Sequence, residues 1–245
     1  MAEILVRQFR DVKLGGGTVI EAIPSVGLVS TIASTYMISS LHLDQVAAID
    51  SDDFPPLSMI YSTKPKFPAR VYADEAKRVA VFVCEVPLPP SLHRPLARTL
   101  LSWADEHQAD RIIGLEGLPL PSGAGREEVQ LWAVGSTDAA REALTKHGLN
   151  QLDTGMISGV TGVLLNEGRW TDYDVIALLA EARAEMPDAY AAAKLVEGVD
   201  LLMPEFEVDL SPLLEQAKAL ESHLQTLQRQ AKPVVRPAAQ DRMYG

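Results

Sequence analysis

The sequence predicts an α/β fold in which a mostly parallel sheet lies sandwiched between helices. Short β-like runs alternate along the chain with segments of helical periodicity, and this alternation is typical of such folds. Several of the runs are apolar nearly throughout, as expected for strands that are covered on both faces. The length of 245 residues suits a single domain, because α/β chains of this size commonly form one compact unit.

The strands and helices are predicted in an alternating order, without a short-period repeat. Strands are expected at residues 18–23, 46–49, 70–72, 78–86, 111–115, 129–134 and 162–165. Helices are expected around residues 28–41, 91–107, 137–147, 172–186 and 188–201.

Several helix boundaries carry specific capping signals. The stretch STD at residues 136–138 supplies a cap and an early negative charge before AAREAL. His147 and Gly148 then supply a cationic last turn and a glycine after the helix end. The stretches TDYD at 171–174 and PDA at 187–189 predict two further helix starts.

The last helix is expected at about residues 211–230 and differs from the others. Ser211 supplies its cap and Pro212 its first helical position. Apolar residues then recur at alternating four- and three-residue steps, and we call these five residues the leucine seam: Leu213, Ala217, Leu220, Leu224 and Leu227. The seam requires a packing partner, which is either the parent domain or the same helix of another subunit.

The chain beyond this helix has the composition of a tether. Pro233 and Pro237 and the loss of periodicity end the helix. We therefore expect one α/β domain at residues 1–231, which includes the last helix, and a flexible, extended tail at residues 232–245.

Composition and charge exclude several classes of function. Asp and Glu number 33 against 22 Lys and Arg, and the net charge of -11 repels phosphate backbones and anionic lipid, so neither nucleic acid nor membrane is an expected partner. Cys84 is the only cysteine and lies in the apolar run VAVFVCEV, where a buried thiol in a reducing interior is expected. The sequence shows no signal peptide pattern and no apolar stretch of roughly 20 residues, which predicts a cytoplasmic protein.

Three loops are candidates for binding a ligand. The loop with Ser25 and Gly27 joins a strand to a helix, where backbone N–H groups can face an anion. Glu116 is the best-placed single carboxylate, because ligands collect at the carboxyl ends of parallel strands, but it lacks an evident partner. Ser158 and Gly159, together with Thr161 and Gly162, can form a backbone nest. For the two glycine loops, the alternative is a tight turn that needs glycine for close packing.

Motifs for catalysis or metal binding are weak throughout the sequence, and a Ser-His-Asp arrangement, whose members meet only in space, stays open. The histidines are His42, His93, His107, His147 and His223, and none has further ligands at metal-binding spacing. Neither a nucleophile elbow, a P-loop nor a dinucleotide fingerprint is present. We therefore expect no catalytic residue, no metal and no cofactor.

The last three residues have a form that peptide-binding pockets recognise. Met243, Tyr244 and Gly245 offer a hydrophobic side chain, a tyrosine and a terminal carboxylate, which can fill two adjacent slots and be bound as a charge. The alternative is a tail without a role.

A resemblance to a known family is carried by six stretches. They are IPSVGLVSTIASTYMISSL, DDFPPLS, RVYADEAKRVAVFVCEVPLP, LLSWADEHQADRIIGLEG, MISGVTGVLLNEG and LLAEARAEMPDAYAAAKLVEGVDLLM. In their order and spacing, from about residue 3 to 227, the chain resembles the proteasome assembly chaperone family related to eukaryotic proteasome assembly chaperone two.

This resemblance implies a fold and a function. The implied fold is a three-layer α/β sandwich of the phosphorylase/hydrolase-like type. The implied function is that of a non-enzymatic homo-oligomer that binds the α subunits of the proteasome in their ring. Met243, Tyr244 and Gly245 match the hydrophobic-Tyr-X tail with which some members dock between neighbouring α subunits, and the pattern accepts any residue at the last position.

Two rival hypotheses remain at this point. The phosphorylase-like fold is shared with enzymes, in which Glu116 or the loop of Ser25 and Gly27 would serve a nucleoside or phosphate, but fold analogy is a poor guide to chemistry. No phosphate-binding Arg or Lys stands near either loop in the sequence. The other rival is a structural oligomer that makes no contact with the proteasome.

Overall fold

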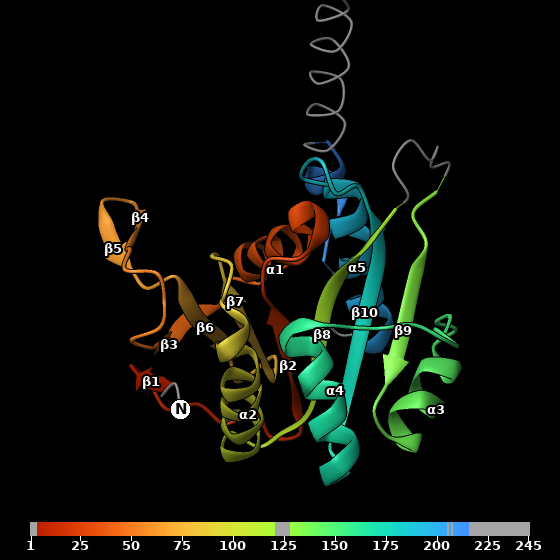
Figure 1. The fold of residues 1–245 in the computed structure, drawn as a ribbon, viewed down its shortest axis with the longest axis horizontal. Coiled ribbons are helices and arrows are strands. Elements are labelled where there is room, and N and C mark those ends of the chain that lie inside the picture. Colours follow the sequence, from red (N-terminus) through yellow and green to blue (C-terminus); the bar gives the residue numbers. More distant parts are fainter. Residues whose placement is uncertain (1–3, 121–127, 205, 207, 216–245) are drawn as a thin grey trace, which may run out of the picture.

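A computed structural model of the chain describes residues 4–120, 128–204, 206 and 208–215. Figure 1 shows these residues as a central sheet with helices on both faces, in three layers. The helices are η1 (Val26–Leu28), α1 (Val29–Ser40), α2 (Pro90–Glu106), α3 (Asp138–Lys146), α4 (Gly159–Thr171) and α5 (Ala189–Leu202). Helices α2 and α4 pack on one face of the sheet, and α1, α3 and α5 bury side chains on the other. The predicted α/β sandwich is confirmed.

The sheet has eight strands in the order β1-β3-β6-β7-β2-β8-β10-β9. These strands are β1 (Leu5–Gln8), β2 (Gly17–Ala22), β3 (Asp44–Asp50), β6 (Ala69–Asp74), β7 (Val79–Cys84), β8 (Ala109–Pro119), β9 (Leu131–Gly135) and β10 (Asp174–Ala182). The four central strands β7, β2, β8 and β10 run parallel to one another. The outer strands pair antiparallel, so the predicted parallel sheet forms the centre of a mixed one.

A two-stranded ribbon, β4 (Met59–Tyr61) and β5 (Lys64–Lys66), lies outside this sheet and projects beyond it (Figure 1). In the chain, the ribbon connects β3 to β6. Next to the turn of the ribbon, the Tyr61 hydroxyl donates to the carboxylate of Glu85 just after β7, which holds the ribbon to the sheet. The sequence did not predict the ribbon or β1, because both are short, and their strand residues are partly or largely exposed rather than apolar runs.

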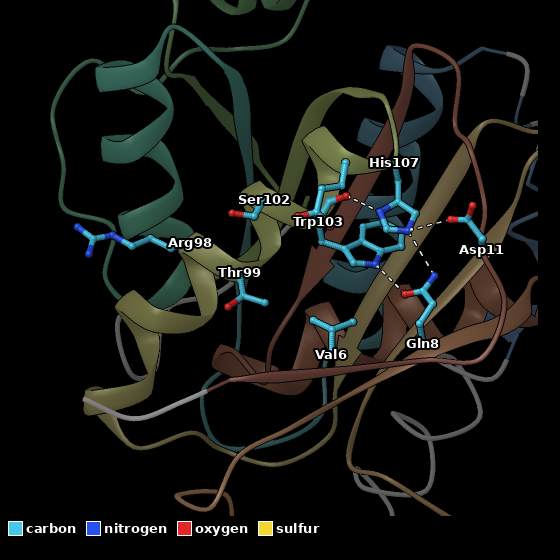
Figure 2. A pocket seen from close by; sticks show the side chains of 9 residues that line it. Val6, Gln8, Asp11, Arg98, Thr99, Ser102, Trp103 and His107 are labelled. Atoms are coloured by element: carbon cyan, nitrogen blue, oxygen red, sulfur yellow. Dashed lines mark hydrogen bonds and ion pairs between the residues drawn. The ribbon is translucent and has the colours of Figure 1, made fainter.

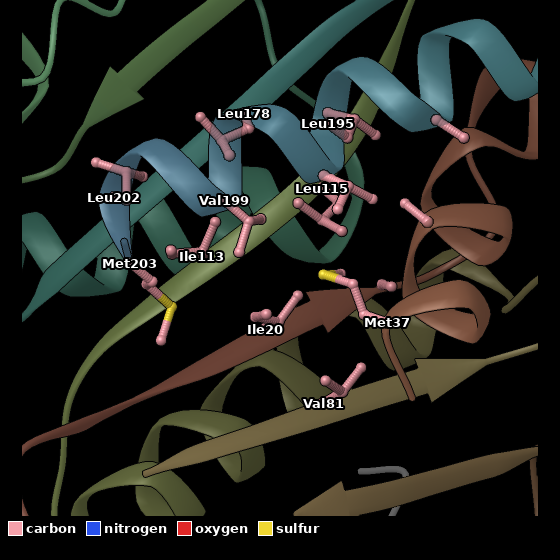
Figure 3. Packing of buried hydrophobic residues seen from close by; sticks show 14 of the residues in the cluster. Ile20, Met37, Val81, Ile113, Leu115, Leu178, Leu195, Val199, Leu202 and Met203 are labelled. Atoms are coloured by element: carbon pink, nitrogen blue, oxygen red, sulfur yellow. The ribbon is translucent and has the colours of Figure 1, made fainter. Parts of the chain in front are cut away.

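Two hydrophobic cores lie on the two faces of the sheet. Under α1 and α5, the strand residues Ile20, Ile113 and Leu178 meet Met37 and Leu195 of the two helices (Figure 3). The second core lies under α2 and α4. Successive strand residues point to opposite cores, which is why the central strands are apolar along their whole length.

The predicted capping residues act as caps in the structure. The Thr137 hydroxyl accepts a hydrogen bond from the N–H of Ala140 at 3.0 Å, at the start of α3. Asp188 accepts from the N–H of Ala191 at 3.1 Å, at the start of α5. Gly148 follows α3 with a φ of 69°, which L-residues other than glycine rarely adopt.

The predicted strand at residues 162–165 was wrong, because these residues lie inside α4. The run GVTGVLL is short, apolar and bounded by glycines, and such a run does not distinguish a buried strand from one face of a helix. In the structure, Val160 and Leu164 are four residues apart and point together into the core beneath α2 and α4.

The predicted helix at residues 172–186 was also wrong, because most of it forms β10. Its Ala, Leu and Glu residues favour helix, but the segment is buried between β8 and β9, and tertiary pairing overrides local propensity. The stretch TDYD ends α4 rather than starting a helix. Asp172 adopts a left-handed conformation with a φ of 58° and caps α4 through its N–H, which donates to the carbonyl of Gly168.

Candidate functional site

The loop with Ser25 and Gly27 follows β2 at the carboxyl edge of the central strands. A Cβ at Gly27 would lie 2.9 Å from the carbonyl oxygen of Arg183, so the loop packs directly against the end of β10. The hydroxyls of Ser25 and Ser30 lie 2.9 Å apart, and the N–H of Asp188 donates to the Gly27 carbonyl. These polar groups are used within the fold, which favours the structural role considered for this loop.

Ser158 and Gly159 stand at the beginning of α4. Ser158 is the N-cap residue in extended conformation, and Gly159 has a φ of 77°. The two residues therefore turn the chain into the helix, which supports the tight-turn alternative over a nest for an anion.

Glu116, predicted from its place at the end of a strand, has two polar neighbours in the structure. The hydroxyl oxygen of Thr161 on α4 lies 2.7 Å from Glu116 Oε1 and 2.8 Å from Oε2 of Glu21 on β2. Glu21 is 1% exposed and Thr161 is fully buried. The sequence reasoning missed Glu21, although a single carboxylate inside an otherwise apolar predicted strand was a signal for it.

Burial controls the electrostatics of this carboxyl pair. It raises the pKa of Glu21 to about 8, with a further increase from the charge of Glu116, while the Thr161 hydroxyl acts in the opposite direction. Burial likewise raises the pKa of Glu116 to about 7. Carboxyls with such pKa values can act as acids or bases near neutral pH. However, Glu21 and Thr161 are closed off from solvent, so a substrate has no access to them in this conformation.

A second polar site lies where β1 crosses the end of α2 (Figure 2). A groove of about 560 Å³ is lined there by Val6, Gln8, Asp11, Arg98, Thr99, Ser102, Trp103, Glu106 and His107. The rings of Trp103 and His107 stack with their centroids 3.9 Å apart. The groove is built on the edge strand rather than at the carboxyl ends of the central strands.

The hydrogen bonds of His107 assign its tautomer. Nδ1 lies 2.7 Å from the carbonyl oxygen of Trp103, which can only accept, so Nδ1 carries a proton. Nε2 lies 3.3 Å from the amide nitrogen of Gln8, which donates to it. His107 therefore ties β1 to the end of α2. Within the described residues, no group of three or more His, Cys, Asp or Glu side chains is arranged to hold a metal ion.

Within the described residues, large apolar side chains are exposed on several elements. The β4–β5 ribbon and the chain before it expose Leu57, Ile60 and Tyr61, and β1 and the residue after it expose Leu5, Val6 and Phe9. Met156, which precedes α4, and Trp170, in the last turn of α4, are 92% and 86% exposed. Exposed aromatic and apolar residues of this size are typical of surfaces that contact other proteins.

The leucine seam is described only at its beginning. Residues 211–215 form a helical turn, in which Leu213 is 2% exposed. The Tyr36 hydroxyl of α1 donates to the Asp209 carbonyl just before this turn, which fixes the start of the last helix against α1. The other seam residues and the last three residues lie outside the described residues: Ala217, Leu220, Leu224, Leu227, Met243, Tyr244 and Gly245. No helix in the described part of the chain has both the length and the apolar character needed to cross a membrane.

Comparisons with known proteins place these features in context. The model of the PAC2 family matches residues 19–228. An uncharacterized protein of Methanocaldococcus jannaschii, MJ0106, is 28% identical over 212 residues, which are 86% of this chain and 85% of the relative.

Solved structures also match over most of their length. Pyrococcus furiosus PbaA, an archaeal homolog of proteasome-assembly chaperone, superposes with a TM-score of 0.84 at 27% identity, over 93% of this chain and 92% of that one. Pyrococcus furiosus PbaB, an archaeal proteasome activator, superposes with a TM-score of 0.80 at 23% identity, over 93% and 100% of the two chains. The second likeness shows the fold.

Proposed function

The chain belongs to the PAC2 family, and from this membership we propose that it is a cytoplasmic, non-enzymatic partner of the proteasome that binds the ring of α subunits as an assembly chaperone or activator. The main support is the match to PbaA, which extends over 93% of this chain and 92% of that protein. A match of that extent covers the whole described domain rather than one shared substructure.

The proposed docking element is the pattern of Met243, Tyr244 and Gly245. In this proposal the Gly245 carboxylate pairs with a lysine of the α ring, Tyr244 packs and hydrogen-bonds at the wall of a pocket between subunits, and Met243 adapts to an apolar slot. Three residues bury little surface, so one docking event has an affinity of roughly millimolar to micromolar.

Weak docking becomes effective when several tails act together. We propose that the protein is a homo-oligomer and that the leucine seam contributes to its packing. The stretch from Lys232 to Asp241 reaches on the order of 30 Å if it is extended at about 3.1 Å per residue. A second tail would then search for its pocket at roughly millimolar effective concentration, which increases the overall affinity without new contacts.

Deleting residues 243–245 tests the docking element. The shortened protein should lose most of its binding to α rings in size-exclusion chromatography, while its melting temperature stays unchanged because we expect the tail to contribute nothing to the packing of the domain. Tyr244→Ala should have nearly the same effect. Gly245→Ala is the matched control, because the pattern accepts any last residue, and it should bind as the parent does. Undiminished binding after the deletion would reject the role of the tail.

An enzyme of the same fold is the second candidate, and the raised pKa values of Glu21 and Glu116 are the observation in its favour. Glu21 is closed to solvent and Glu116 is only partly exposed, which argues against an enzyme. A thermal-shift experiment with phosphate, nucleosides and ATP distinguishes the two functions. A stabilisation that Glu116→Ala removes would support the enzyme, and its absence together with α-ring binding would support the proteasome partner.

A further inference from the structure

Thr161 occupies a position between two carboxyl groups that only a glycine makes possible. Glu21 on β2 is the register partner of Gly114 on β8, and Glu116 lies two residues further along β8 on the same face. A Cβ at Gly114 would be 2.6 Å from the methyl carbon of Thr161 and 3.0 Å from Glu21 Oε2. The missing side chain lets the first turn of α4 descend between the two carboxyls.

The hydrogen bonds at this position require a proton beyond the one on the hydroxyl. Thr161 Oγ1 contacts Glu21 Oε2 at 2.8 Å and Glu116 Oε1 at 2.7 Å. A hydroxyl carries one proton, so it can donate to one carboxylate only. The other contact is a hydrogen bond only when that carboxyl is protonated and donates to the hydroxyl oxygen. If both carboxyls were ionised, two oxygens without a proton between them would face each other at hydrogen-bonding distance.

We propose that Glu21 and Glu116 hold a shared proton through the Thr161 hydroxyl at neutral pH, and that its loss at mildly alkaline pH releases the first turn of α4 from the sheet. The site holds one negative charge while the proton is present. It holds two when the proton leaves, with Glu21 closed to water and Glu116 only partly exposed, and separating α4 from β2 and β8 then readmits water to Glu21.

Among the residues that the structure describes, the charged groups on the neighbouring elements do not supply a compensating cation. Cys84 of β7 faces Glu21, and burial raises the pKa of its thiol to about 12, so it remains neutral. Beyond it, Arg70 and Glu85 are paired with each other. On the helix side, Arg94 and Arg98 of α2 both contact Glu167 of α4 at the exposed surface. The shared proton is thus the group that limits the charge of the site.

The direction of the pH effect follows from the two raised pKa values. Both folded-state values, about 8 for Glu21 and about 7 for Glu116, lie above the ordinary 4.5 of an unfolded chain. The folded chain therefore binds more protons than the unfolded chain. The contribution of the two carboxyl groups to the free energy of unfolding is fully present below the unfolded pKa and is lost as the pH rises through the folded pKa values. Stability should fall between about pH 5 and about pH 8.

Urea unfolding at intervals between about pH 5 and about pH 9 tests the proposal. The unfolding constant should rise about tenfold per pH unit for each proton held by the folded chain alone. Glu21→Gln and Glu116→Gln should each lower this slope by close to one proton, since glutamine does not titrate. Glu142→Gln, which makes the same charge change at an exposed site on α3, should leave the slope unchanged. Equal slopes in the parent chain and both buried-site variants would overturn the proposal.

Two measurements separate a shared proton from a merely structural contact. The parent protein at neutral pH should show the infrared carbonyl stretch of a protonated carboxylic acid, and this band should disappear toward about pH 9. Absence of the band at neutral pH would refute the proposal even if no variant folds. Amide exchange in the first turn of α4, corrected for the intrinsic effect of pH, should accelerate over the same range. Thr161→Val should abolish this acceleration of amide exchange. Thr161→Ser, which keeps the hydroxyl, should retain it.

Discussion

Gly114 on β8 and Thr161 on α4 approach so closely that a methyl group added at Gly114 would lie 2.6 Å from Thr161 Cγ2. This approach determines how far α4 descends onto the sheet. It also brings the Thr161 hydroxyl to both Glu21 and Glu116. The packing of one helix and the chemistry of the buried carboxyls therefore depend on the same glycine.

Gly114→Ala should destabilise the protein by about 1–3 kcal/mol, because the new methyl group overpacks a buried contact that cannot yield without moving α4. Urea unfolding measures the loss. Gly155→Ala is the matched control, since its added Cβ would face only the flexible end of Leu152. Similar losses in the two variants would contradict the importance given to the contact between α4 and β8.

Glu85→Gln should cost about 3 kcal/mol of unfolding free energy. The side chains of Arg70 and Glu85 are only 4% and 10% exposed, so the substitution leaves the guanidinium charge buried and unpaired. Asp50→Asn removes the partner of Arg7, which is 50% exposed, and should cost about 1 kcal/mol or less. Denaturant titrations of both variants check this, and the prediction fails if their costs are the same.

The thiol of Cys84 should react with aromatic disulfide reagents at least about a hundredfold more slowly in the folded protein than in denaturant. Cys84 is fully buried, and burial raises its pKa to about 12, so the reactive thiolate is scarce at neutral pH. The absorbance of the released reagent follows the rate. Rapid labelling under native conditions would show that the strand containing Cys84 opens readily.

The sequence predicted the elements whose boundaries carry chemical signals. Thr137 and Asp188 cap α3 and α5 as expected, because a side-chain acceptor at a helix start has few competing structural roles. The helix and strand assignments were wrong for α4 and β10, which follow each other in the chain. Both segments are short and apolar, and their difference lies in long-range pairing that no local pattern records.

The buried carboxyl pair was half predicted. The position of Glu116 after an apolar strand identified it as a candidate, but its partners come from β2 and α4, 95 and 45 residues away in the chain (116 − 21 and 161 − 116). Spacing along the sequence carries no signal for such a group. The tail pattern of Met243, Tyr244 and Gly245 is the reverse case, since it is read entirely from the sequence and remains a prediction.

The order of the sheet also has a consequence for synthesis of the chain. Strand β10 lies between β8 and β9, although β9 is made first. When a growing chain has left the ribosome only as far as β9, the strand β10 that pairs with β9 in the sheet has not yet been made. Strand β8 then exposes an open edge. At roughly 5–20 residues per second, translating the 47 residues from the end of β9 to the end of β10 (182 − 135) takes a few seconds. During that interval the open edge of β8 is available for pairing with other chains.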